Sequence, residues 1–425
     1  MTAPSFTVEV DHNPFLHDGA TRVDAVVAVT ASGAGAAAVP AARALEIIIV
    51  DCSSSMWGAK MHSAQEATVA AIEQLRDGVD FVLLAGTHDV TQVYPRAGTA
   101  TVNHRTRAEA VATARLLQAN GGTAIGAWLT LARQLAEQHP GGVRHAILLT
   151  DGQNGEQAGV LEAVLAEAAG AFVCDCRGVG TDWDVDELRR ISSALLGGFE
   201  IVARPDDLAA DFAAMMSTAM GKGVADVALR LWTPRGATVR FVKQVDPTIA
   251  DLTPRRTESG AQRGDYPLGV WGDETRLYHL GVEVPAQAIG AQMLAARVSL
   301  VRAGSTDVLG EGRVTATWTD DTALSTRISR QVAHFTGQAE LAEAIQDGLA
   351  ARRAGDERTA TARLGRAVAL AAESGNDDTA RLLERVVEVV DAPSGTVRLR
   401  AGVDKADEMT LDTRSTKTVR VRGTA

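Results

Sequence analysis

A short apolar run at residues 45–50 constrains the fold more than any other part of the sequence. It reads Leu-Glu-Ile-Ile-Ile-Val, and such a nearly continuous run is typical of a central parallel strand that is buried on both faces. An acid and two hydroxyl side chains follow at once, as Asp51, Ser53 and Ser55. Open α/β sheets bind their ligands in the crevice beyond the carboxyl ends of their strands. The sequence therefore predicts a ligand site at the end of this strand.

A second strand and a pair of glycines supply two more oxygen-bearing side chains. Residues 143–150 form another apolar run, and Asp151 follows it directly. Between the two runs, a Gly-Gly pair precedes Thr123 at the start of a helix predicted at 124–136. Mg²⁺ accepts carboxylate and hydroxyl oxygens at roughly 2.0–2.1 Å. We therefore expect a hard cation at the point where these oxygens meet.

The order Asp-x-Ser-x-Ser, then Thr, then Asp resembles the metal-ion-dependent adhesion site of the von Willebrand factor A domain family. Residues 178–202 are similar to the closing strand, helix and strand of that family, so the resemblance covers roughly residues 44–220. It assigns the metal ligands to five positions: Asp51, Ser53, Ser55, Thr123 and Asp151.

The resemblance implies a doubly wound, mostly parallel α/β sheet of the Rossmann-like type. It also implies Mg²⁺ or Mn²⁺ as the bound ion, with Ca²⁺ as another option. In the family, a carboxylate of the protein ligand enters an open position on the ion. We therefore expect a protein partner that offers an Asp or Glu, with Met56 and Trp57 adding apolar contact area beside the ion. The alternative for Trp57 is a side chain packed within the loop.

The same residues are compatible with other roles. An Asp that ends a strand is often only a helix cap, and Ser-rich turns are common in loops. The alternative function is a Mg²⁺-dependent hydrolase or phosphotransferase of the haloacid dehalogenase type, with Asp51 as nucleophile. That chemistry needs a second carboxylate two positions on, where this chain has Ser53. The serines at 53–55 also lack the Gly-x-Ser-x-Gly pattern of a serine hydrolase. We therefore expect a protein that is not an enzyme.

Composition and charge narrow the class of protein further. The net charge of −11 argues against nucleic-acid binding and against anionic membranes. Only 5 of the 42 basic residues are Lys, which suggests a bacterial source with a GC-rich genome. The odd count of 3 Cys fits a reduced compartment. The N-terminus does not resemble a signal peptide, and no apolar run reaches the roughly 18 residues of a membrane span. We expect a cytoplasmic protein.

The 425 residues are too many for one ordinary domain. Apolar residues recur with the period of two that is typical of strands before residue 44 and after residue 221, and helices of period 3.6 occur between them. The strands predicted before residue 44 and those predicted after residue 221 are each too few to form a sandwich alone. We therefore predict an α/β domain inserted in a β-sandwich and followed by a C-terminal helical bundle. Residues 257–265 are predicted to be a polar loop. The predicted boundaries are 1–43 for the N-terminal sandwich strands, 44–220 for the α/β domain, 221–325 for the remaining sandwich, 326–392 for the bundle and 393–425 for a polar tail.

The polar tail suggests a second binding surface. Its Thr413, Ser415, Thr416 and Thr418 follow acidic residues and resemble the threonine-bearing peptides that forkhead-associated domains bind once phosphorylated. The alternatives are a solvated tail without function and an ordered edge strand of the sandwich. The whole chain is therefore interpreted as an adaptor, in which the metal site binds one partner and the bundle and tail contact others within a phospho-signalling assembly.

Overall fold

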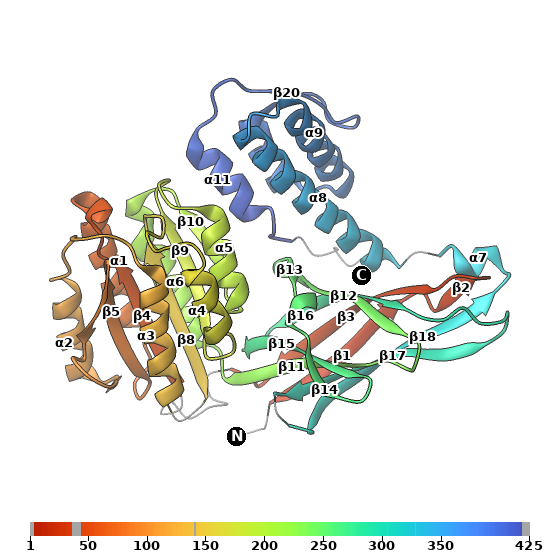
Figure 1. Cartoon of the computed structure of the whole chain (residues 1–425), viewed down its shortest axis with the longest axis horizontal. Coiled ribbons are helices and arrows are strands. Elements are labelled where there is room, and N and C mark those ends of the chain that lie inside the picture. The colour runs from red at the N-terminus through yellow and green to blue at the C-terminus, as the bar shows by residue number, and fades with distance from the viewer. Residues whose placement is uncertain (1–3, 36–43, 140–141, 304, 328, 419–425) are drawn as a thin grey trace. The chain divides into compact units, whose positions relative to one another are not determined.

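The computed structural model describes residues 4–35, 44–139, 142–303, 305–327 and 329–418 (Figure 1). The chain divides into two compact units. The α/β unit contains Gly33–Ala225 and Gly269–Asp273, and the second unit contains Ser5–Ser32, Asp226–Leu268 and the chain from Glu274 onward. The α/β unit is thus an insertion between two parts of the second unit, as predicted.

The α/β unit is built on one mixed sheet. Its strands are β4 (Ala44–Asp51), β5 (Asp80–Gly86), β6 (Val90–Tyr94), β7 (Ala100–Thr101), β8 (Val143–Thr150), β9 (Val173–Val179) and β10 (Phe199–Val202). Their order is β10-β9-β8-β4-β5-β6, with β7 paired to β5. Pairing is parallel from β10 through β4 to β5, while β6 and β7 are antiparallel to β5. The predicted doubly wound, mostly parallel sheet is confirmed, and every residue of the central strand β4 is buried.

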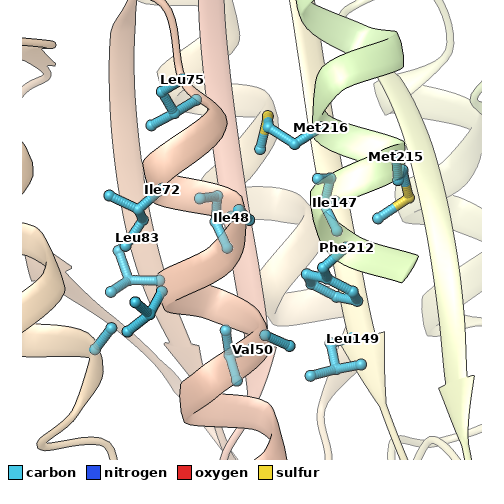
Figure 2. Packing of buried hydrophobic residues seen from close by; sticks show 14 of the residues in the cluster. Ile48, Val50, Ile72, Leu75, Leu83, Ile147, Leu149, Phe212, Met215 and Met216 are labelled. Atoms are coloured by element: carbon cyan, nitrogen blue, oxygen red, sulfur yellow. The ribbon is translucent and has the colours of Figure 1, made fainter. Parts of the chain in front are cut away.

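Helices cover both faces of this sheet. They are α1 (Ala59–Gln74), α2 (His104–Ala114), α3 (Ile125–Gln138), α4 (Val160–Ala168), α5 (Val185–Ala194) and α6 (Leu208–Met220). Figure 2 shows the apolar layer between the sheet and helices α1 and α6. It contains Ile72 and Leu75 of α1, Phe212, Met215 and Met216 of α6, and Ile48, Val50, Leu83, Ile147 and Leu149 of the strands. This packing fixes the ends of β4 and β8 side by side.

The second unit contains a β-sandwich. The strands of one sheet are β1 (Ser5–His12), β3 (Arg22–Ser32), β16 (Thr275–Glu283), β12 (Thr238–Asp246) and β13 (Ala250–Asp251), in that order. Those of the other sheet are β14 (Thr257–Gly260), β15 (Arg263–Trp271), β11 (Val224–Trp232), β17 (Gln292–Arg302), β18 (Val308–Thr319) and β2 (Phe15–His17). Glycines let the sheets approach closely, because a Cβ at Gly312 would lie only 2.6 Å from a methyl carbon of Val10. The predicted insertion of the α/β domain in a sandwich is confirmed.

One predicted loop is wrong. Residues 257–265 form an antiparallel hairpin in which β14 pairs with β15, with Gln262 in the left-handed region at φ 62°. The sequence is polar because β14 is a short strand at the edge of the sheet and is largely exposed. Edge strands commonly carry polar and charged side chains, since these discourage pairing with other chains.

The helical bundle follows the sandwich, as predicted. After the short helix α7 (Thr322–Ser325), it contains α8 (Arg330–Arg353), α9 (Glu357–Ser374) and α10 (Asp377–Val386). A hairpin of β19 (Val387–Asp391) and β20 (Thr396–Leu399) and a further helix, α11 (Lys405–Arg414), come after α10. Among the described helices of the whole chain, none combines the length and the apolar character of a membrane span.

The prediction of a solvated polar tail needs correction, because α11 packs on the bundle. Leu411 belongs to the apolar core of the bundle, and Met409 is also buried. The carboxylate of Asp412 is buried too, and it pairs with Arg353 at 3.0 Å. A few apolar residues suffice here because they dock on helices that already form a core. The segment is polar in composition but folded.

The hydroxyls that suggested phosphorylation are largely engaged within the fold. Thr413 and Ser415 are buried, and their hydroxyls donate to the carbonyls of Met409 and Asp412 at 2.9 and 2.7 Å. The backbone carbonyl of Thr416 accepts a hydrogen bond from the N–H of Ile249, and Lys417 forms an isolated bridge with Thr248. The segment therefore contacts the sandwich through one short bridge rather than through a full edge strand.

This packing predicts resistance to proteolysis. We expect trypsin to cleave after Arg414 at least about 100-fold more slowly in the native chain than in a synthetic peptide of residues 404–418, because cleavage requires α11 to unfold locally. Mass spectrometry of timed digests measures both rates. Leu411→Ala should accelerate cleavage of the native chain, since it removes a core contact of α11. Equal rates in chain and peptide would show that the segment is accessible.

Candidate metal centre

Asp51 lies at the carboxyl end of β4 and is completely buried. One carboxylate oxygen accepts a hydrogen bond from the backbone N–H of Ser53 at 2.7 Å, and the other accepts one from the hydroxyl of Thr150 at 2.6 Å. Burial raises the pKa of the Asp51 carboxyl, and the hydrogen bonds from Ser53 and Thr150 partly oppose this effect. The side chain is therefore held in one orientation by the ends of two neighbouring strands.

The loop after β4 is fixed by backbone contacts to two other loops. The N–H of Cys52 donates to the carbonyl of Gly86 at 2.7 Å. The N–H and the hydroxyl of Ser54 both donate to the carbonyl of Gly121 at 2.9 Å. Ser53 is the N-cap of a short 3₁₀ helix, Ser54–Met56. These contacts bring the Ser-rich loop next to the glycine pair that precedes Thr123.

The remaining predicted oxygens converge on the same point. The hydroxyl of Ser55 lies 2.9 Å from that of Ser53 and donates to a carboxylate oxygen of Asp151 at 2.6 Å. The hydroxyls of Thr123 and Ser55 both lie next to Gly152, since a Cβ built on this glycine would be 3.2 Å from the first and 3.5 Å from the second. The same Cβ would lie 3.9 Å from an Asp51 oxygen. The structure thus brings all the predicted residues together at the ends of β4 and β8.

This set of donors fits a hard divalent cation. Neighbouring ligands of an octahedral ion with bonds of roughly 2.0–2.1 Å are about 2.9 Å apart, which matches the spacing of the Ser53 and Ser55 hydroxyls. Two carboxylates supply the negative charge. Within the described ranges, no group of three or more His, Cys, Asp and Glu side chains is arranged to hold a metal. The candidate metal centre is therefore the site at the ends of β4 and β8, where hydroxyl oxygens complement the two carboxylates. These five residues would be direct or water-mediated ligands of the cation.

The sequence interpretation missed two residues that position Thr123. Both oxygens of Glu156 accept from backbone N–H groups in the first turn of α3, at 2.6 and 3.0 Å, and Asn154 accepts from the next-earlier N–H at 3.0 Å. A carboxylate is favourable at a helix N-terminus because it satisfies unpaired N–H groups and complements the helix dipole. The carbonyl of Thr123 accepts from Gly155 at 2.7 Å. The loop after Asp151 therefore holds the Thr123 loop in place.

Lys60 is a further residue that the sequence interpretation missed. Its ammonium lies 2.6 Å from the carboxylate of Asp151 and 3.2 Å from that of Asp182. Burial lowers the pKa of Lys60, but the hydrogen bonds and charges of Asp151 and Asp182 outweigh it and raise the pKa above its usual value. No short-range pattern in the sequence links these positions, because they come together only through the fold.

Met56 and Trp57 differ in exposure. Met56 is fully buried, whereas Trp57 is 80% exposed. The interpretation of Trp57 as a packed loop residue is therefore wrong, and Met56 offers no surface to a partner. A large apolar side chain beside a strand-end site is available for contact with another molecule.

Comparison with known proteins agrees with the α/β fold. A model of the von Willebrand factor type A domain matches residues 46–201, and a model of the von Willebrand factor type A C-terminal domain matches residues 369–415. The solved structure of a von Willebrand factor type A protein from Catenulispora acidiphila is 48% identical in sequence, with a TM-score of 0.93. The similarity covers 99% of this chain and 98% of that one. No curated protein matches the chain.

More distant structures share the fold. The ArnB paralog VWA2 from Sulfolobus acidocaldarius is 14% identical with a TM-score of 0.60, over 98% of both chains. The human COPII-coat protein Sec24c is 10% identical with a TM-score of 0.54, and the match covers 88% of this chain and 57% of that protein.

This chain belongs to the von Willebrand factor type A family. Domains of this family are generally non-catalytic interaction modules, and they typically bind a divalent metal at a strand-end site of this kind.

Proposed function

We propose that this protein is a non-catalytic adaptor that binds a partner protein through a divalent cation, Mg²⁺ or Mn²⁺, held by Asp51, Ser53, Ser55, Thr123 and Asp151. The observation that carries the proposal is the convergence of three hydroxyls and two carboxylates from separate loops at one edge of the sheet. When bound, the cation would supply positive charge that attracts a carboxylate. With five side chains as direct or water-mediated ligands, an octahedral ion keeps at least one position for water, and an Asp or Glu of the partner would take that position.

The surroundings of Asp51 favour a ligand over a nucleophile. The side chain is buried, and each of its oxygens accepts a hydrogen bond from the protein. An aspartyl nucleophile needs a nearby acid or base, and position 53 holds a hydroxyl instead of a second carboxylate. These features support binding rather than phosphoryl transfer.

Trp57 is the apolar anchor of the proposed interface. Exposed Trp side chains are frequent hot spots of protein interfaces because they bury a large area with little loss of conformational freedom. Trp57 follows directly after the 3₁₀ helix that contains Ser55, so a partner that reaches the ion also reaches the indole. The buried hydroxyls of Thr413 and Ser415 favour partner binding at the metal site over a phosphorylated C-terminal segment.

The first test of this proposal is metal-dependent stability. Mn²⁺ at 100 times its dissociation constant should stabilise the wild-type chain by about 2.7 kcal/mol, measured by thermal unfolding and by calorimetric titration. Asp51→Ala and Asp151→Ala should abolish both signals, because each removes a charged ligand. Asp207→Ala is the matched control, since that carboxylate belongs to the same unit and is exposed. Undiminished Mn²⁺ stabilisation in both site variants would refute the assignment.

The partner is tested separately. Wild-type protein on a resin should retain the partner from a native lysate in Mg²⁺ and release it in a chelator, whereas Asp51→Ala should retain none. Trp57→Ala should bind Mn²⁺ like wild type but retain less partner. Retention that is equal with and without chelator would place partner binding elsewhere on the chain.

A further inference from the structure

Lys60 occupies an unusual position for a cationic side chain. It is the second residue of α1, at the helix end where the dipole disfavours positive charge. The first turn of α1 contains no acidic residue, and the N-cap, Gly58, provides no side-chain cap. Helix stability therefore does not explain a lysine here. Its contacts lie instead at the metal centre.

The ammonium of Lys60 is the counter-ion of a buried carboxylate. The side chain of Asp151 is completely buried, and its two oxygens are taken by the Ser55 hydroxyl at 2.6 Å and by the Lys60 ammonium at 2.6 Å. The carboxylate of Asp51 belongs to the same cluster, because it accepts from the N–H of Ser53, whose hydroxyl lies 2.9 Å from that of Ser55. Lys60 neutralises the same carboxylate of Asp151 that a divalent cation would use. A cation that approaches Asp151 must therefore meet a positive charge already in place.

A second acceptor lies within reach of Lys60. The carboxylate of Asp182 is 3.2 Å from the ammonium and 66% exposed. Its loop is fixed, because the N–H of Gly180 donates to Val202 and the carbonyl of Gly180 accepts from the indole of Trp183. Gly180 also faces the stem of Lys60. The lysine can thus leave Asp151 and keep an ionic partner, with only a small movement of its flexible end.

We propose that Lys60 is a built-in competitor of the divalent cation: its ammonium neutralises Asp151 when no cation is bound and moves to Asp182 when a cation binds. This inference rests on the proposed metal-binding function and concerns its regulation. Lys60 then sets the affinity of the site, since every binding event includes the cost of breaking the Lys60–Asp151 pair. It also links cation binding to the loop that carries Asp182.

Calorimetric titration with Mn²⁺ alone tests this inference. Lys60→Met keeps the length and apolar stem of the side chain but removes the charge, and it should bind Mn²⁺ about 5- to 20-fold more tightly than wild type. Lys60→Arg keeps the charge and should stay within about 3-fold of wild type. Asp182→Asn removes the alternative acceptor and should bind more weakly, by about 3- to 10-fold.

Thermal unfolding in a chelator gives an independent readout. Lys60→Met should unfold at a lower temperature than wild type in chelator, because Asp51 and Asp151 lose their counter-ion, and it should gain more from Mn²⁺. If wild type and Lys60→Met both fail to bind Mn²⁺, the metal-binding function itself is refuted. If wild type binds and Lys60→Met binds equally or more weakly, Lys60 only orients Asp151, and the competitor role is overturned while the metal site stands.

Discussion

A chain that lacks residues 5–32 should fail to form its second unit. β3 lies between β1 and β16 and pairs with β16 over Arg22 to Thr30. Six of its apolar side chains are almost completely buried: Val23, Ala25, Val26, Val27, Val29 and Ala31. At about 1.5–3 kcal/mol for each large side chain, their loss approaches the whole stability of an ordinary domain, about 5–15 kcal/mol. The deletion also leaves β16 as an unpaired edge.

Size-exclusion chromatography and denaturant unfolding measure this result. We expect aggregation, or loss of the cooperative transition that belongs to the second unit. The α/β unit should keep its own transition, because all of its strands lie within residues 44–202. Glu9→Ala, at an exposed position of β1, is the control and should unfold like wild type. A soluble deletion variant with both transitions intact would contradict the role assigned to β3.

Replacing His145 with Leu should destabilise the α/β unit by about 3–5 kcal/mol, because it leaves the buried carboxylate of Glu46 and the partly buried carboxylate of Asp175 without their shared partner. One ring nitrogen of His145 lies 2.7 Å from Glu46 on β4, and the other lies 2.9 Å from Asp175 on β9. Carboxylates on both nitrogens require both to carry protons. Burial lowers the pKa of His145, but the charges and hydrogen bonds of Glu46 and Asp175 outweigh it and raise the pKa to about 9.

The same contacts predict a pH dependence. Because the pKa of His145 is higher in the folded state than its usual 6.5, its stabilising effect is complete below about pH 6.5 and is lost as the pH rises through about 9. The expected loss in the free energy of unfolding is at most about 3 kcal/mol. Urea unfolding at pH 6.5 and pH 10 should show it in wild type and not in His145→Leu. His62→Leu, at an exposed position of α1, should behave like wild type, and an equal loss in His145→Leu would exclude His145 as the cause.

The sequence was informative where a residue's role depends on its neighbours along the chain. The run at 45–50 predicts a buried strand by its composition alone, and the oxygens of Asp51, Ser53 and Ser55 follow from their position at its end. The cap of α5 is equally local, because Asp184 directly precedes Val185 and its carboxylate accepts from the N–H of Glu187. Such features depend on neighbouring residues and can therefore be predicted from the sequence.

Features that depend on the fold were missed. Lys60 meets Asp182 across 122 positions of the chain, and no periodicity predicts such a pairing. The strand at 257–260 is polar because it is an exposed edge strand, so its composition is that of a loop. The few apolar residues of α11 stabilise a helix only when a bundle core is already present, so its composition is that of a solvated tail. In each case tertiary contacts outweighed local composition.

The pairing of β3 with β16 has a consequence for synthesis on the ribosome. The hydroxyl oxygens of Thr30 and Thr275 lie 2.9 Å apart in the folded chain, whereas the two residues are 245 positions apart in sequence. At about 5–20 residues per second, the nascent β3 waits roughly 12–50 seconds for its neighbour to emerge. The inserted α/β unit can fold during that interval, while the apolar face of β3 stays uncovered. We therefore expect β1 and β3 to bind a ribosome-associated chaperone during synthesis. The speed of translation through residues 33–275 then determines how long this binding is needed.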